Sequence, residues 1–440
     1  MKTGLRIALA LSLLVAPMTA FAQSADRAER PEKWAVVLST SEAGDITKNA
    51  PNAAFSFTVL GEKTVLVGQE SVFSHLSGKH LDRSPVGLRK GEEALLFSNR
   101  DPALRRMSFS GARPILKVQG MWVLLANETA KMGLMAKTSA FTQVEPLPAD
   151  TVVLTPSRAP SKGPHRGPLS GLLDRVNIET FKTDVKALAD LKTRYTYGAG
   201  ADAALVYCEK KLQELGLKTR RQSFSGSGKP RDNLEAVQPG FDQGNSGEVI
   251  IIGHLDSTSP KASTLAPGAD DNGSGAAGVL EMARFLKGLK GRAGVRFVLV
   301  LGEEQGLLGS KAYVASLSPT EIAKLRGVIN MDMISFDAKP PLSAVIETAS
   351  FNTQMAEQMS QLAADYTTLT SQISYNPWGS DHVPFLKKEV PTVLTIESEY
   401  DDNPTYHQIT DTPDRMNNDL AFQILRLNAA ALAEMADVER

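Results

Sequence analysis

Five short motifs spread between Gly253 and His407 each carry a side chain that can bind a metal ion. In chain order they are Gly-His-Leu-Asp (253–256), Gly-Ala-Asp-Asp-Asn-Gly-Ser-Gly (268–275), Gly-Glu-Glu (302–304), Asn-Met-Asp-Met (330–333) and Tyr-His (406–407). Two histidines and three carboxylates form a mixed nitrogen and oxygen ligand set, which suits zinc and would be unusual for a dedicated calcium or magnesium site. The set predicts a metallohydrolase.

The sequence around these motifs alternates between strand and helix patterns. Residues 248–252 and 295–301 are nearly continuous apolar runs, which are typical of central strands covered on both faces. Helical spacing of apolar residues is found at 203–215, 272–289 and 418–438. We therefore expect an α/β fold with a mostly parallel central sheet flanked by helices. His254, Glu303 and Asp332 directly follow apolar runs, so the site should lie beyond the carboxyl edge of the sheet.

The first third of the chain has a different pattern. Short β-rich runs broken by Gly, Asn and Pro predict a small β-rich N-terminal domain, with strands at 34–39, 54–59, 63–67, 94–97, 115–118 and 122–125. His75 and His80 lack further ligands nearby and are predicted to lie in a solvated loop. Six prolines between Pro146 and Pro168 indicate an extended linker. The predicted boundaries are 1–22, a signal peptide; 23–150, the β-rich domain; 151–174, the linker; and 175–440, the α/β domain.

The start of the chain predicts export. Lys2 and Arg6 precede an apolar run at residues 7–15, and residues 20–22 read Ala-Phe-Ala, the small-x-small pattern that a signal peptidase cleaves. The apolar run is too short to span a bilayer, and no membrane anchor is expected. We therefore expect an exported protein, either periplasmic or secreted.

Composition narrows the possible partners. The chain has 48 basic and 49 acidic side chains, so no global field attracts nucleic acid or anionic lipid. We expect specificity to come from a local pocket. Cys208 is the only cysteine, so no intramolecular disulfide can form, and its helical spacing with Leu205 and Leu212 predicts a buried core thiol.

The ordered motifs, together with Ser-Asp-His at 380–382, resemble those of the secreted bacterial two-zinc aminopeptidases, the leucyl aminopeptidase-like metallopeptidases of clan MH. The resemblance covers about residues 175–440. It implies two zinc ions per chain, held by five ligands: His254 and Asp332 on one ion, Glu304 and His407 on the other, and Asp271 bridging both. It also implies a cis peptide bond between Asp271 and Asn272.

The resemblance also implies catalytic roles. Glu303 matches the general base of the family and Glu304 its ligand, and on an extended segment two neighbours would point to opposite sides. Asp256, two residues after His254, is expected to hold the imidazole tautomer. Tyr406 is expected to place a phenol near the developing oxyanion, as in some family members.

Several residues beside the motifs have open interpretations. Asp381 and His382 match a family motif near the pocket without being metal ligands, so hydrogen-bonding support is expected of them. An apolar substrate pocket and ordinary core packing are equally compatible with a further set beside the site motifs: Met333, Trp378, Ile396 and Tyr400.

The predicted function is that of a zinc aminopeptidase acting on peptides with a free N-terminus, releasing large apolar residues. One alternative is a glutaminyl-peptide cyclotransferase of the same fold, a family that typically has Trp before the final histidine where this chain has Tyr406. The alternative from another class is a metal-free binding module with a peptidase-like fold. The sequence leaves open the preferred residue, the oligomeric state, and whether the β-rich domain is a propeptide or an accessory domain.

Overall fold

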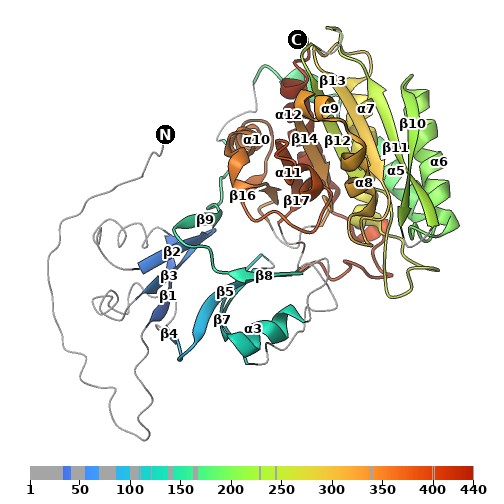
Figure 1. Ribbon diagram of the computed structural model, residues 1–440. Helices are drawn as coiled ribbons and strands as arrows, with labels where there is room; N and C mark the ends of the chain where they lie inside the picture. The colour runs from blue at the N-terminus through green and yellow to red at the C-terminus, as the bar shows by residue number, and fades with distance from the viewer. Residues whose placement is uncertain are drawn as a thin grey trace, which may run out of the picture. The chain divides into compact units, whose positions relative to one another are not determined.

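The computed structural model describes residues 33–40, 55–68, 86–99, 109, 111–119, 121–136, 142–161, 167–226, 229–242, 245–336, 340–398, 400 and 402–439 (Figure 1). The chain divides into two compact units. Unit 1 comprises residues 1–98 and 106–156, and unit 2 comprises residues 99–105 and 157–440. The predicted signal peptide, His75 and His80 lie outside the described residues.

Unit 1 is built from short strands in two sheets. One sheet has the strand order β9-β2-β3-β1-β4 and the other has the order β6-β7-β5-β8. The strands are β1 (Trp34–Ser39), β2 (Phe55–Leu60), β3 (Lys63–Gly68), β4 (Val86–Gly87), β5 (Glu92–Asn99), β6 (Arg113–Val118), β7 (Met121–Asn127), β8 (Thr142–Pro146) and β9 (Thr151–Leu154), and α3 (Glu128–Met135) follows β7. The prediction of a β-rich N-terminal region is confirmed.

The first residues of the predicted linker form a strand. β9 pairs in parallel with β2, and Val153 and Leu154 are buried against the strands of unit 1. A proline-rich composition does not exclude a strand here, because Thr151–Leu154 is itself free of proline.

Unit 2 contains a mixed sheet with a parallel centre. Its strand order is β10-β11-β13-β12-β14-β17-β15-β16. Neighbours from β13 to β17 and the pair β15/β16 are parallel, whereas β10/β11, β11/β13 and β15/β17 are antiparallel. The strands are β10 (Lys218–Gly226), β11 (Lys229–Gln238), β12 (Glu248–His254), β13 (Gly294–Val300), β14 (Leu325–Met331), β15 (Ser343–Glu347), β16 (Thr370–Ser374) and β17 (Thr392–Glu397). The predicted fold class is confirmed.

Helices cover both faces of this sheet (Figure 1). In β12, Val249 and Ile251 belong to a buried cluster with residues of α5, α6, α7, α10 and α12, whereas Ile250 and Ile252 belong to a second cluster with residues of α8 and α11. This alternation explains why the strand sequence is apolar throughout. The helices are α4 (Ser170–Leu173), α5 (Ile178–Ala189), α6 (Ala199–Glu214), α7 (Gly275–Leu286), α8 (Leu308–Ser316), α9 (Pro319–Lys324), α10 (Thr353–Tyr366), α11 (His382–Leu386) and α12 (Asn418–Met435), with short turns η2 (Ala269–Ser274), η3 (Ser350–Asn352) and η4 (Pro413–Arg415).

The register of the central strands places the motifs at one edge. β12 pairs His254 with Val300 of β13 and Ile252 with Asn330 of β14. His254 lies two residues after Ile252, and Asp332 lies two residues after Asn330. The register therefore places His254 beside Asp332. The start of α7 lies close against the end of β14, because a Cβ on Gly275 would stand only 2.2 Å from the Met331 carbonyl oxygen.

Two further predictions concern single features of the described residues. Cys208 is fully buried in the core as expected, and burial raises the pKa of its thiol. Within the described part of the chain, no helix has the length and apolar character needed to cross a membrane.

Candidate metal centre

Five segments deliver the candidate ligands to the carboxyl edge of the central strands. His254 is the last residue of β12, Asp271 lies in η2, Glu304 follows β13, Asp332 directly follows β14, and His407 lies in the loop after β17. Within the described residues, their ligand atoms gather in two groups whose members lie within 4.8 Å of one another: His254, Glu303 and Asp332, and Asp271, Glu304 and His407. The structure thus brings all five predicted ligands together.

Asp271 stands between the two histidines. Its Oδ1 lies 3.4 Å from Nε2 of His254, and its Oδ2 lies 3.0 Å from Nε2 of His407. Nε2 of His254 is also 3.3 Å from Oδ1 of Asp332, and Nε2 of His407 is 2.9 Å from Oε2 of Glu304. Each imidazole therefore faces one carboxylate of its own and one oxygen of a shared carboxylate. The Asp271–Asn272 peptide bond is cis, as the resemblance implies.

The buried charges in this cluster are not balanced. Burial alone would lower the pKa of His407, but the carboxylates of Glu304 and Asp271 raise it to about 10. At His254, burial likewise lowers the pKa of the imidazole, but the negative charges of Asp332 and Glu303 raise it well above its ordinary value. Burial raises the pKa of Glu304 to about 7. The buried carboxylates outnumber the imidazoles, and their negative charge favours the protonated form of both histidines. Bound cations would balance this surplus of negative charge.

The oxygens themselves fit a metal. Within the described residues, Oε1 and Oε2 of Glu304 and Oδ2 of Asp271 receive no hydrogen bond, although Nε2 of His407 lies close to two of these atoms. Buried carboxylate oxygens without donors are costly unless an ion takes the donor's place. Nδ1 of His254 lies 3.2 Å from the Asp256 carbonyl oxygen, which leaves Nε2 to face the carboxylates. Imidazole nitrogens and carboxylate oxygens in this ratio suit zinc.

Asp256 does more than was predicted for it. Its carboxylate oxygen Oδ1 is 3.6 Å from Nδ1 of His254, so the backbone carbonyl is the nearer partner of that nitrogen. The carboxylate instead accepts the amides of Glu303 and Glu304, both at 3.3 Å, and the Thr196 hydroxyl at 2.9 Å. Asp256 therefore connects the end of β12 to the residues that follow β13.

Glu303 and Glu304 lie in a turn, so the predicted extended segment is wrong. The amides of Gly306 and Leu307 both donate to the Glu303 carbonyl at 2.8 Å. Positive φ angles at Gly302 (78°) and Gly306 (95°) allow the chain to reverse here, a conformation that glycine adopts without strain. The two carboxylates still separate, one into each group of ligand atoms.

Tyr406 lies against the second histidine. Its ring centroid is 4.0 Å from that of His407, and burial together with the negative charge of Asp271 and Glu304 raises the pKa of its phenol well above the ordinary value. The phenol therefore keeps its proton and can act as a donor. It belongs to a buried apolar cluster with Met333, Val345, Leu394, Ile396 and Tyr400. Trp378, predicted with them, is buried but lies outside this cluster, and its amide donates to Glu347.

The Ser-Asp-His motif contributes through its serine. Ser380 donates a 2.6 Å hydrogen bond to Oδ2 of Asp332 and accepts one from Asn330. His382 instead faces Glu347, with 3.1 Å between Nε2 and Oε1, and Asp381 is fully buried with its pKa raised to about 7 by burial. Sequence reasoning expected support from Asp381 and His382 and did not single out Ser380. The Ser-Asp-His motif at 380–382 is the sequence feature that could have identified Ser380.

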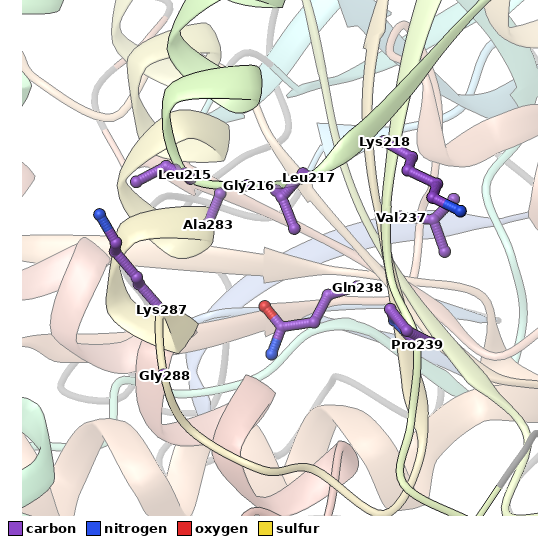
Figure 2. A pocket seen from close by; sticks show the side chains of 10 residues that line it. All are labelled: Leu215, Gly216, Leu217, Lys218, Val237, Gln238, Pro239, Ala283, Lys287 and Gly288. Carbon is purple, nitrogen blue, oxygen red and sulfur yellow. The ribbon is translucent and has the colours of Figure 1, made fainter.

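A separate cavity lies at the far end of α7. It has a volume of about 550 Å³ and is lined by side chains that include Lys218, Gln238, Ala283 and Lys287 (Figure 2). No histidine or carboxylate lines it. It therefore lacks the histidine and carboxylate ligands that a zinc site requires.

Parts of this sequence are similar to known proteins. Residues 233–432 match the model of Peptidase family M28. The chain is 42% identical over 139 residues to leupeptin-inactivating enzyme 1 of Streptomyces exfoliatus, covering 31% of this chain and 30% of that protein. It is 30% identical over 195 residues to aminopeptidase YwaD of Bacillus subtilis, covering 44% of this chain and 42% of that protein. The chain thus spans less than half the length of either relative.

Solved structures share the fold at low identity. The LapA aminopeptidase of Legionella pneumophila aligns with a TM-score of 0.56 at 16% identity, over 78% of this chain and 98% of that one. BSAP, a zinc aminopeptidase from Bacillus subtilis, aligns with a TM-score of 0.54 at 17% identity, over 60% of this chain and 96% of that one. These similarities establish the fold of unit 2, and the family match confirms the resemblance predicted from the motifs.

Proposed function

We propose that the chain is a zinc-dependent aminopeptidase that releases N-terminal residues from peptides, because residues 233–432 match the model of Peptidase family M28. The observation that carries the proposal is the position of Asp271, whose two oxygens face His254 and His407 separately. A carboxylate shared in this way supports two zinc ions per chain. His254 and Asp332 would hold one ion, Glu304 and His407 would hold the other, and Asp271 would contribute an oxygen to each.

Zinc ions bound here would supply Lewis-acid chemistry, which lowers the pKa of a water molecule toward neutrality and stabilises negative charge on the carbonyl oxygen under attack. The protein supplies the proton transfers. Glu303 accepts a proton from the attacking water as the new carbon–oxygen bond forms, and gives a proton to the leaving amine as the carbon–nitrogen bond breaks. The products are a free amino acid and a peptide shortened by one residue.

The surroundings of Glu303 suit this role. Burial raises the pKa of its carboxyl well above the ordinary value, and the positive charge of His254 opposes that rise. Cations in the cluster would oppose it further, so that Glu303 is ionised when water must be deprotonated. The Asp256 carboxylate accepts the Glu303 amide and orients the turn. Tyr406 remains protonated, and its phenol donates a hydrogen bond to the developing oxyanion.

The preferred substrate has a free amine and a large apolar first residue. The apolar cluster of Tyr406 includes Met333, which directly follows Asp332, so apolar side chains lie beside the proposed metal ligands. A cluster rich in carboxylates also favours the cationic amine of a peptide N-terminus. The chain is 26% identical, over 61% of its length, to leucine aminopeptidase 1 of Arthroderma otae, and the name of that relative supports a preference for leucine.

One experiment tests the proposal. The purified protein receives a leucyl peptide and its N-acetylated form, each with and without a zinc chelator. We expect leucine release from the unblocked peptide alone, lost with the chelator and restored by zinc. Equal cleavage of the acetylated peptide contradicts exopeptidase action, and full activity after complete zinc removal contradicts the metal chemistry.

We also propose that the protein is exported. Lys2, Arg6, the apolar run at 7–15 and the Ala-Phe-Ala sequence at 20–22 support a cleaved signal peptide. N-terminal sequencing of the protein recovered from a bacterial expression host tests this. We expect the mature chain to begin near Gln23, and a chain that keeps residues 1–22 in the cytoplasm contradicts the proposal.

A further inference from the structure

The segment that leads into Asp271 has little regular structure of its own. Gly268 has a positive φ of 54°, and Asp271 and Asn272 depart from helical angles inside η2. The loop that carries His407 is likewise formed by turns across its described residues 402–412. Ligands on irregular backbone need other contacts to hold them to the few tenths of an ångström that a metal requires. Two buried charged side chains from distant parts of the chain provide such contacts.

Arg194 supplies the first set. This side chain is fully buried, and Nε donates to the Leu255 carbonyl at 2.8 Å, Nη1 to Pro267 at 2.5 Å and Nη2 to Gly268 at 2.7 Å. Leu255 directly follows His254. The guanidinium therefore joins the end of β12 to the segment before Asp271, through a planar fork of donors that lysine cannot reproduce.

Asp411 supplies the second set from the other side. Its carboxylate is buried and accepts the amides of Asp270 at 2.9 Å and Asp271 at 3.0 Å, while its own carbonyl accepts the amide of Ala269 at 3.1 Å. Asp411 comes four residues after His407 on the same loop. It therefore ties the His407 loop to the backbone of the bridging aspartate.

We propose that Arg194 and Asp411 act together as positioning residues, a clamp that grips the carbonyls and the amides of residues 267–271 and so holds His254, Asp271 and His407 in register for zinc. The clamp rests on the proposed function, because it matters only if the cluster binds metal. It also extends the site beyond the segment that matches the family model, since Arg194 precedes residue 233.

The charges of the clamp fit this arrangement. Burial lowers the pKa of Arg194, but the negative charges of Asp411, Asp256 and Asp271 oppose that change. A buried guanidinium stays protonated. Because its hydrogen-bond partners are three neutral carbonyls, its positive charge is not paired with a single acid and acts on the surrounding carboxylates. Burial raises the pKa of Asp411 to about 7, and the positive charge of Arg194 is one of the effects that oppose this rise.

Zinc affinity, measured by competition with a fluorescent chelator, tests the clamp without relying on peptidase activity. Arg194→Lys keeps the charge and loses the fork, and Asp411→Asn loses one acceptor oxygen. Each should weaken zinc binding by about 10- to 100-fold, the usual effect of removing a group that orients ligands. Because both side chains hold one segment, the double variant should lose less than the product of the two single effects.

Matched controls separate positioning from general stability. Arg175 also donates to two carbonyls, those of Phe285 and Lys287, but at the far end of α7, and Asp184 is a buried carboxylate paired with Tyr207 and Arg284. Arg175→Lys and Asp184→Asn should lower the melting temperature of the metal-free protein and keep wild-type zinc affinity. If Asp411→Asn does not fold, Asp411→Glu keeps both oxygens but displaces them by one methylene, and should also weaken zinc binding.

The outcomes are distinct. Weaker zinc binding in the clamp variants, with wild-type affinity in both controls, supports the clamp. Wild-type affinity in folded Arg194→Lys and Asp411 variants, or fully independent effects in the double variant, overturns it and leaves the proposed function intact. A wild-type protein that takes up no zinc contradicts the proposed function and the clamp together.

Discussion

Glu303 and Glu304 are neighbours in the chain, yet the carboxylate of Glu303 gathers with His254 and that of Glu304 with His407. The turn at these residues separates the two side chains, while Asp256 fixes both of their amides. One oxygen of Glu304 lies 2.9 Å from Nε2 of His407, whereas Glu303 comes no nearer than 4.0 Å to Nε2 of His254. This difference supports a ligand role for Glu304 and a proton-transfer role for Glu303.

The first prediction separates these two roles. Glu303→Gln removes the base and keeps a side chain of the same size, so turnover should fall by roughly 10²- to 10⁴-fold while zinc content stays unchanged. Glu304→Ala should instead lower zinc content, because it removes a ligand. Metal analysis beside steady-state kinetics on a leucyl amide checks both variants. Loss of zinc in Glu303→Gln, or full zinc content in Glu304→Ala, would reverse the assignment.

The second prediction concerns Tyr406. Tyr406→Phe deletes only the hydroxyl and keeps the ring contact with His407, so the ligand should stay in place. If the phenol donates mainly in the transition state, kcat should fall by roughly 10- to 10³-fold with a smaller change in KM. Kinetics on the leucyl amide measure both constants. A large rise in KM at unchanged kcat would place the hydroxyl in substrate binding instead.

The third prediction concerns pH and zinc uptake. The neighbouring carboxylates raise the pKa of His407 to about 10 in the absence of metal, so below that pH the imidazole carries a proton that zinc must displace. Apparent zinc affinity should therefore rise between pH 6.5 and 8.5, by about tenfold per unit for each proton released. Chelator competition at three pH values measures the slope. An affinity that does not change with pH contradicts a protonated metal-free site.

The fourth prediction concerns the N-terminal β-rich region, predicted as residues 23–150 and hypothesised to act as a propeptide or lid. Prolines between Pro146 and Pro168 give an accessible site for proteolysis. Limited proteolysis after Leu154, where β9 ends, should raise the rate on a small amide substrate if the region inhibits the enzyme. No change in rate after clean excision rules out inhibition and leaves an accessory role.

The parts of the fold that could be predicted are those with local signals. The apolar runs at 248–252 and 295–301 correspond to β12 and β13, because a strand buried on both faces must be apolar throughout. The predicted helix at 272–289 starts at Gly275 instead, since the residues before it form the irregular turn that carries Asp271. The candidate ligands, which the structure brings together in two groups, were equally accessible to prediction, because their residue types and order are visible in the chain.

The residues that support the ligands could not be predicted in the same way. Ser380 contacts Asp332 across 48 positions of sequence, and Arg194 reaches carbonyls 61 to 74 positions away. Such contacts depend on how distant segments pack, which no local pattern records. Asp411 lies near His407 in sequence, but its partners are the amides of residues 269–271. The turn at Glu303 was missed because glycines at 302 and 306 permit several backbone shapes.

The most direct measurement of the central claim offers the zinc-loaded protein both a leucyl amide and an N-terminal glutaminyl peptide, with zinc content determined on the same sample. A hydrolase needs water activated between two metals, whereas a cyclotransferase needs the substrate's own amine to attack its side-chain amide with water kept out. We expect two zinc ions per chain and release of leucine. Pyroglutamate formation without leucine release, with one zinc ion per chain, would contradict it and identify a cyclotransferase.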